Sequence, residues 1–426
     1  MSHLKRIKRI SISSGIYAGT GFFQQGASFF LLPLLTRFLT PFQFGILATF
    51  QVIYAFGQTF IDQGASVAVS REYFDMDTDD FGKYVFNTII IKLIFLFILS
   101  CFLLLCRNLL FEKKDFPFWL LLGIPWIAFM TAFITTLSRL WIVQKKAHFY
   151  SLFELGRAVV NVILSIFFVS ILLMNWKGRI LGIAITETLF MCFCVGFLIK
   201  ENLWNINFNL TYIKEILKFG VPVFIFGAGQ WIMNLTDRLF INAMAGLSET
   251  GIYSMGYSVA SIIEVIAAGV GLTVMPLFYE KLKNPTSEEK KTMVKYIYLY
   301  LTILLFITVF WILFSPYFLQ IFVDKKYFSA ASFIPLISWT YFINGIYRIL
   351  SIYISYSKRT YLFLYPVITG ALINIILNYI LIRQNGTIGA AQATLISFCI
   401  KVLITWFIVQ KIYPMPWIRF YKKPAA

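Results

Sequence analysis

Apolar residues fill about twelve stretches of the chain, each long enough to form a helix that crosses a lipid bilayer. The stretches lack the alternation of apolar and polar residues that marks a β-strand, and backbone groups at membrane depth need partners within their own segment. The pattern therefore predicts an all-α polytopic membrane protein. The predicted spans cover residues 11–35, 43–69, 84–106, 116–138, 150–173, 179–199, 219–244, 251–278, 292–314, 329–355, 361–382 and 388–410.

The first six stretches are echoed, in the same order, by the last six. Corresponding features include Gly45 and Gly251, Lys145 and Lys358, and Asn161 and Asn374. An even number of spans in each copy gives both copies the same orientation, as in transporters whose substrate site lies between two halves. We therefore predict two parallel six-helix lobes, residues 1–200 and 219–426. A partly amphipathic cytoplasmic helix at residues 201–218 is expected to join them.

Composition agrees with the membrane assignment and narrows the function. Hydrophobic residues make up 59% of the chain and charged residues only 13%, which leaves too little polar surface for a soluble globule. The five Cys lie in apolar runs without CxxC spacing, and the two His are far apart. The sequence therefore predicts no disulfide framework, no metal site and no cofactor.

The formal net charge of +18 would suit a nucleic-acid-binding protein, so the position of the charges matters. Most Lys and Arg residues fall in alternate connecting segments, beginning with the N-terminal one. Under the positive-inside rule, this asymmetry places both termini in the cytoplasm. It also explains the basicity without nucleic acid, which we do not expect as a partner.

In most predicted spans the polar residues recur at i, i+3, i+4 and i+7, which places them on one face of a helix. Hydrogen bonds between spans need only one or two such residues, so we interpret the stripes as the lining of a wet translocation path. Stripe residues expected to contact the substrate include Gln24, Asn161, Asn234 and Asn344.

Basic residues also lie within the predicted spans, where a charge costs at least about 2.5–3.5 kcal/mol at the helix centre. Lys92, Arg157, Arg348 and Lys401 each lie about seven to ten residues from the cytoplasmic end of a span, about 10–15 Å deep. Their similar depth predicts a basic chamber open to the cytoplasmic side, with Arg238 further toward the outer side. The alternative is that these long side chains snorkel to the near interface.

Acidic residues at membrane depth are candidates for coupling transport to an ion gradient. Glu154 is expected to pair with Arg157 one turn away, and Asp237 could neutralise its neighbour. The remaining acids have no cation nearby in sequence, so they either pair with a cation on another span or carry a proton or ion. No P-loop for nucleotide hydrolysis is present. Our candidates for coupling to H⁺ or Na⁺ are Asp237, Asp62, Glu187 and Glu264.

Residues 31–53 and 236–261 resemble Wzx-type polysaccharide flippases of the multidrug/oligosaccharidyl-lipid/polysaccharide exporter superfamily. The resemblance rests on Pro33, Leu35, Thr36, Arg37, Leu39, Thr40, Pro41 and Gly45, and on Asp237, Arg238, Gly251, Ile252 and Tyr253. The related lipid II flippases carry arginines in their first span, and this chain has none there, so their substrate contacts do not transfer.

The resemblance implies that the protein flips undecaprenyl-diphosphate-linked oligosaccharide repeat units across the bacterial inner membrane by alternating access. The product would serve O-antigen (lipopolysaccharide), capsule or exopolysaccharide synthesis, with a polysaccharide polymerase and a chain-length regulator as partners. On this interpretation the diphosphate is held by Arg157, Arg348, Lys92, Lys401 and Arg238.

Three other functions remain open alternatives. A drug/cation antiporter of the same superfamily would favour an acidic, aromatic pocket over a basic one. A major-facilitator transporter would carry a Gly-x-x-x-Asp-Arg-x-Gly-Arg-Arg loop where residues 70–83 stand. A membrane-bound polysaccharide polymerase or ligase would need a large outer loop, whereas every predicted loop is short, so we expect no enzymatic activity.

Overall fold

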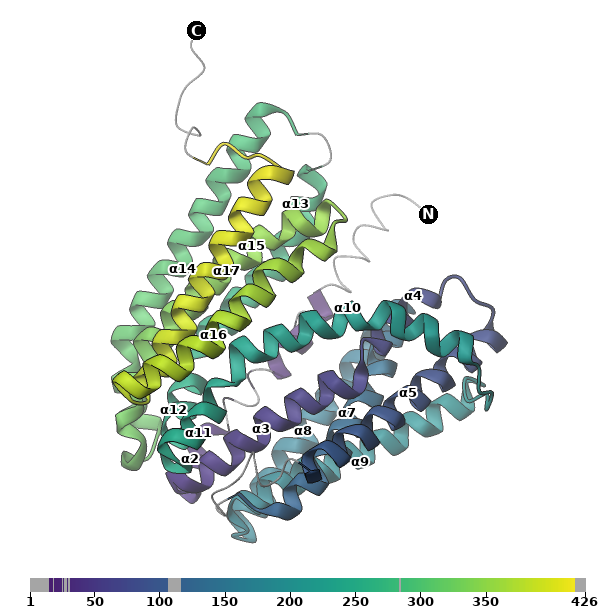
Figure 1. The fold of residues 1–426 in the computed structure, drawn as a ribbon, viewed down its shortest axis with the longest axis horizontal. Coiled ribbons are helices and arrows are strands. Elements are labelled where there is room, and N and C mark those ends of the chain that lie inside the picture. The colour runs from purple at the N-terminus through teal and green to yellow at the C-terminus, as the bar shows by residue number, and fades with distance from the viewer. Residues whose placement is uncertain are drawn as a thin grey trace. The chain divides into compact units, whose positions relative to one another are not determined.

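The computed structural model describes residues 15–417 except residues 18, 25, 27, 28, 30, 106–115, 283 and 284. Within the described residues every regular element is helical (Figure 1), which confirms the predicted all-α class. The α-helices are α2 (Leu32–Phe38), α3 (Pro41–Asp62), α4 (Ala65–Glu72), α5 (Thr78–Leu105), α7 (Phe118–Val143), α8 (Ala147–Ile166), α9 (Asn175–Lys200), α10 (Leu210–Leu235), α11 (Asp237–Ala245), α12 (Leu247–Ala260), α13 (Ile262–Lys281), α14 (Ser287–Phe322), α15 (Ile334–Tyr356), α16 (Leu364–Asn385) and α17 (Ile388–Ile412). Three short segments are η1 (Phe167–Ile171), a π-helix, and the 3₁₀ helices η2 (Lys325–Ser332) and η3 (Thr360–Phe363).

The chain forms two compact units. The first unit comprises Met1–Trp231 and Gly246–Gly251, and the second comprises Ile232–Ala245 and Ile252–Ala426. In the first unit α7 packs against α3, α4, α5, α8 and α9, so α7 is its central helix. In the second unit α17 packs against α15 and α16, while α13 and α14 contact α15. Most of α10 belongs to the first unit, and the predicted lobe boundaries at residues 200 and 219 stay a prediction.

Ten of the described helical segments are long and apolar enough to cross a membrane. They correspond to ten of the predicted spans, the exceptions being residues 11–35 and 329–355. The first of these lies partly outside the described residues. The second corresponds to α15, whose 23 residues are long enough to cross but include the polar stripe with Asn344 and Arg348.

Many large apolar side chains lie on the outer surface, while several polar and charged side chains are buried, as expected for helices in lipid. In α5, Asn87 and Lys92 are fully buried, while Phe97 is 70% exposed. A soluble protein would hide such a large apolar side chain, whereas a lipid-facing helix presents it to the bilayer. In α5, therefore, these polar residues face the interior of the unit and Phe97 faces outward.

A shared turn supports the internal duplication. Lys145 and Lys358, which correspond in the two copies, adopt left-handed backbone conformations with φ of 60° and 58°. Each follows a long helix, α7 or α15, and its N–H donates to the carbonyl oxygen three residues earlier, at 3.0 and 3.1 Å. A left-handed residue commonly ends a helix, so both copies stop their fourth span in the same way.

Candidate functional site

The five acids expected at membrane depth each form an ion pair within their own unit. The pairs are Asp62–Lys92 at 2.9 Å, Glu154–Arg157 at 3.4 Å, Glu187–Arg157 at 2.8 Å, Asp237–Arg238 at 2.9 Å and Glu264–Arg348. The two pairings expected from sequence neighbours, Glu154 with Arg157 and Asp237 with Arg238, are present. Each of the other acids pairs with a cation on another helix, which is one of the two alternatives that the sequence left open.

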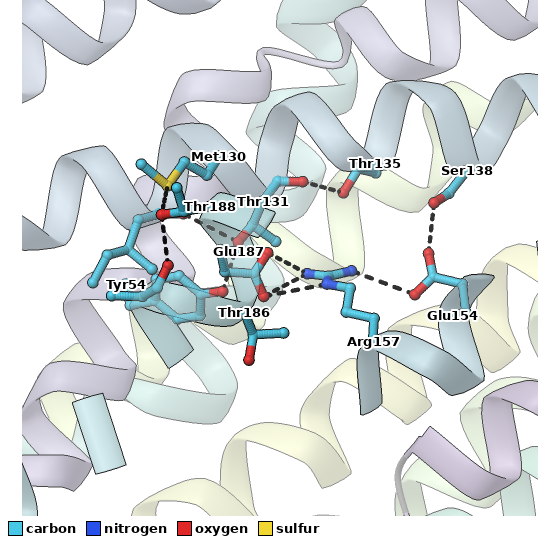
Figure 2. A network of polar contacts seen from close by, with 12 residues as sticks. Tyr54, Met130, Thr131, Thr135, Ser138, Glu154, Arg157, Thr186, Glu187 and Thr188 are labelled. Atoms are coloured by element: carbon cyan, nitrogen blue, oxygen red, sulfur yellow. Dashed lines mark hydrogen bonds and ion pairs between the residues drawn. The ribbon is translucent and has the colours of Figure 1, made fainter. Parts of the chain in front are cut away.

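In the first unit, Arg157 on α8 lies between two carboxylates, as Figure 2 shows. Its Nη2 donates to both oxygens of Glu187 on α9, and its Nη1 donates to Glu154 Oε2. Glu154 also accepts hydrogen bonds from Ser138 at 2.5 Å and from Gln24 at 2.6 Å. One cation is therefore shared by two acids, and the cluster has an excess of negative charge.

Lys92, on α5, is buried in the first unit and does not contact the Arg157 cluster. Its Nζ contacts Asp62 from α3, the Ala132 carbonyl oxygen at 2.6 Å and the Thr136 hydroxyl, both on α7, and Ser66 Oγ on α4 at 3.2 Å. The side chain is 0% exposed, so the ammonium group neither snorkels to a surface nor presents a free donor. This arrangement ties α3, α4, α5 and α7 together.

A cavity of about 230 Å³ lies beside the Arg157 cluster in the first unit. It is smaller than the roughly 300–1,000 Å³ of typical ligand pockets, so it suits a compact group rather than an oligosaccharide. Four predicted site residues line it, namely Gln24, Arg157, Asn161 and Glu187. Arg179, which the sequence analysis did not single out, lines it as well.

A sequence signal for Arg179 existed. It precedes Glu187 by eight residues, and positions i and i+8 of a helix lie close to the same face. Arg179 is also the first residue of the predicted sixth span, so its position alone does not predict that it lies at membrane depth. The structure places it inside α9, on the cavity wall with Glu187.

In the second unit, four predicted residues form one polar chain. Glu264 on α13 accepts from Arg348 and from Asn344 Nδ2 at 3.1 Å, both on α15. Asn344 Oδ1 in turn accepts from Lys401 Nζ on α17 at 3.0 Å. Lys401 is 0% exposed and lies over the rings of Phe398 and Tyr347, at 3.9 and 4.2 Å from their centroids. Cation–π contacts thus help to hold a buried charge.

Asp237 and Arg238 form a separate cluster in the second unit. Asp237 Oδ1 accepts from the Arg238 backbone N–H and Nη1, and its Oδ2 accepts from the Tyr253 hydroxyl at 2.6 Å. Arg238 also donates to the Asn234 carbonyl oxygen at 2.8 Å and lies 4.1 Å from the Tyr257 ring centroid. The exposed fractions of Asp237 and Arg238 are 1% and 6%, and their contacts with Tyr253 and Tyr257 connect α11 to α12.

The structure thus groups the predicted site residues into sets within each unit. A single basic chamber made by both halves stays a prediction, as do the transport roles of the individual residues. Among the described residues, no group of three or more His, Cys, Asp or Glu is placed to hold a metal ion.

A family model described as "Polysaccharide biosynthesis protein" matches residues 13–282, more than half of the chain. The chain belongs to the polysaccharide biosynthesis protein family. A second model, MatE, matches residues 222–380. The sequence-based assignment to this transporter superfamily is confirmed.

Two similar proteins come from Haemophilus influenzae. An uncharacterized membrane protein is 26% identical over 264 residues, or 60% of this chain. The Lsg locus putative protein 1 is 22% identical over 266 residues, also 60% of this chain. In both comparisons the chain spans 62% of the relative's length.

Solved structures show the fold. An inward-facing multidrug resistance transporter of the MATE family matches with a TM-score of 0.70 and 15% identity, covering 95% of this chain and 98% of that chain. The lipid II flippase MurJ, in an inward closed conformation, matches with a TM-score of 0.70 and 18% identity, covering 94% of this chain and 87% of that chain. The protein is a multi-pass membrane protein with this fold.

Proposed function

We propose that the protein flips an undecaprenyl-diphosphate-linked oligosaccharide from the cytoplasmic to the outer leaflet of the bacterial inner membrane. The observation that carries the proposal is the match of residues 13–282 to the polysaccharide biosynthesis family. The buried cations and amides inside both units support it, because a diphosphate needs charged donors and a glycan needs neutral ones. Orientation with both termini in the cytoplasm, and a place in O-antigen, capsule or exopolysaccharide synthesis with a polymerase and a chain-length regulator, belong to the same proposal.

Arg348 is the best placed of the proposed diphosphate ligands in the second unit. Its side chain is 39% exposed, so part of the guanidinium is within reach of a ligand. Its Nε is buried without a hydrogen-bond partner among the described residues, although buried polar atoms normally have one. Arg157 differs, because Glu154 and Glu187 occupy its donors and a diphosphate would have to displace a carboxylate.

Deleting the gene should abolish surface polysaccharide and leave lipid-linked repeat units in the cytoplasmic leaflet. The reason is that the polar glycan and diphosphate cannot cross the apolar bilayer core unaided. Mass spectrometry of lipid extracts, with cell-surface glycan staining, measures both effects. Complementation by the wild-type gene is the control, and the accumulated lipid identifies the glycan.

Normal surface glycan in a deletant without a related flippase would overturn the proposal. The second candidate is a drug/cation antiporter, which the MatE match at residues 222–380 favours. That function predicts a deletant with normal glycan and increased sensitivity to cationic drugs. The same strain therefore separates the two functions.

We also propose that flipping is coupled to an H⁺ or Na⁺ gradient through acids of the predicted set. Glu264 is the most suitable of these in the second unit, since its side chain is 20% exposed and bonds to both Arg348 and Asn344. In proteoliposomes, collapse of both gradients should slow wild-type flipping, and Glu264→Gln should remove that dependence. Glu288→Gln is the matched control, because Glu288 is 74% exposed at the start of α14. Wild-type flipping that is unchanged without gradients would exclude coupling.

A further inference from the structure

Arg179 differs from Arg157, the other basic residue lining the first unit's cavity, in its partners. Arg157 has two carboxylate partners, whereas Arg179 forms no ion pair within the part of the chain that the structure describes. Its hydrogen bonds go to neutral groups on α8, with Nη1 donating to Asn161 Oδ1 at 2.7 Å and to Ser165 Oγ at 2.6 Å. No carboxylate among the described residues is therefore in direct contact with its guanidinium, although Glu187 lines the same cavity.

The free edge of the guanidinium has the geometry for binding an oxyanion. A guanidinium carries five N–H donors, and the two described bonds of Arg179 both leave from Nη1. Nε and Nη2 therefore keep three donors, of which the Nε–H and one Nη2–H lie parallel along one edge. Neither atom has a hydrogen-bond partner among the described residues, and the Arg179 side chain is partly exposed. Two parallel N–H groups on one edge match two oxygens of a phosphate or carboxylate.

Asn161 and Ser165 hold this donor fork in place. They lie four residues apart, one turn of α8, and both accept from the same nitrogen. Such a fixed side chain loses little conformational entropy when it binds a ligand. The cavity it lines, about 230 Å³, accommodates a compact anion and is too small for several sugars.

We propose that Arg179 forms an anion-binding subsite in the cavity of the first unit, where its Nε–Nη2 edge takes a phosphate or carboxylate group. If the proposed function holds, the anionic group is the diphosphate of the lipid carrier. An acidic sugar of the glycan would supply a similar group, a carboxylate. Asn161 acts as a positioning residue for the guanidinium.

The test is binding of inorganic pyrophosphate, and separately of glucuronate, to the purified full-length protein by calorimetry. Arg179→Gln should weaken binding of the preferred anion about tenfold to a hundredfold, because a charged, two-bond contact is lost. Arg179→Lys keeps the charge but not the fork, and should weaken binding by a smaller factor. Lys177→Gln, which removes an exposed charge from the same helix, should leave binding unchanged.

A preference for pyrophosphate assigns the subsite to the carrier diphosphate, and a preference for glucuronate assigns it to an acidic sugar. The subsite is excluded if wild-type protein binds neither anion, or if Arg179→Gln binds as wild type does. Should Arg179→Gln fail to fold, an unchanged affinity in Arg179→Lys excludes the bidentate contact. The assay needs neither lipid nor gradient, so it can detect anion binding through Arg179 even if the protein does not flip lipids. Equally, the protein can flip lipids even if Arg179 binds no anion.

Discussion

Arg157→Gln is expected to lower the free energy of unfolding by about 3–5 kcal/mol, the usual cost of removing one partner from a buried ion pair. Glu154 and Glu187 are 5% and 4% exposed, and both would lose their counter-charge at once. Glutamine keeps some hydrogen bonding but no charge, so it cannot compensate for two carboxylates. Unfolding of the detergent-solubilised protein by titrated denaturant, followed by circular dichroism, measures the change.

The double variant Arg157→Gln/Glu187→Gln should recover part of this loss. The remaining acid, Glu154, would still accept hydrogen bonds from Ser138 and Gln24. Arg383→Gln, at an exposed position of α16, is the control and should change stability by less than about 0.5 kcal/mol. Wild-type stability in Arg157→Gln would mean that the two acids are protonated or hydrated, and that they do not need the Arg157 charge in the folded protein.

The positions of the spans could be predicted because lipid selects long apolar segments, but helix ends depend on other forces. The predicted span at residues 292–314 is the apolar centre of α14, which runs from Ser287 to Phe322. Thr286 and Glu289 form a capping box that starts this helix several residues before its apolar part. Similarly, the predicted span at residues 43–69 is interrupted, because Gln63 and Gly64 adopt left-handed conformations between α3 and α4.

Charged residues at membrane depth could be located from the sequence, whereas most of their partners could not. Glu154 and Arg157 are one helical turn apart, so their pairing follows from helix geometry alone. Glu187 lies 30 positions from Arg157, and Glu264 lies 84 positions from Arg348. Those pairings depend on which helices pack together, and the sequence of one chain does not contain that information in local form.

The ion pairs reduce the number of basic residues that are free to bind an anionic substrate. Four cations at similar depth in the sequence suggest a strongly positive chamber, yet three of them, Lys92, Arg157 and Arg348, have an acid within ion-pair distance. Lys401 and Arg179 differ, because neither has a carboxylate within ion-pair distance among the described residues. Ligand binding thus competes with internal acids at the paired sites, whereas no carboxylate among the described residues lies within ion-pair distance of Arg179, although Glu187 lines the same cavity.

Gly45→Ala is expected to destabilise the protein by about 1–3 kcal/mol, the typical cost of forcing extra atoms into a packed interface. A Cβ on Gly45 would collide with the Leu247 carbonyl oxygen, and a Cβ on Gly251 would collide with the Pro41 carbonyl oxygen. All four residues belong to the first unit. Because both obstacles are backbone atoms, no side chain can rotate away, and the start of α12 must move from α3. Gly251→Ala should have a similar effect, since the two contacts are reciprocal.

The control is Gly123→Ala in α7, where a Cβ would have nothing within 4 Å. Alanine favours a helix over glycine by up to about 1 kcal/mol, so this variant should be neutral or more stable. Thermal unfolding in detergent therefore separates packing from helix propensity by the sign of the change. If Gly45→Ala also raised stability, the close contact between α3 and α12 would not exist in the folded protein. A loss confined to Gly45→Ala and Gly251→Ala would show that each glycine leaves room for the backbone opposite it: Gly45 for the Leu247 carbonyl group and Gly251 for the Pro41 carbonyl group.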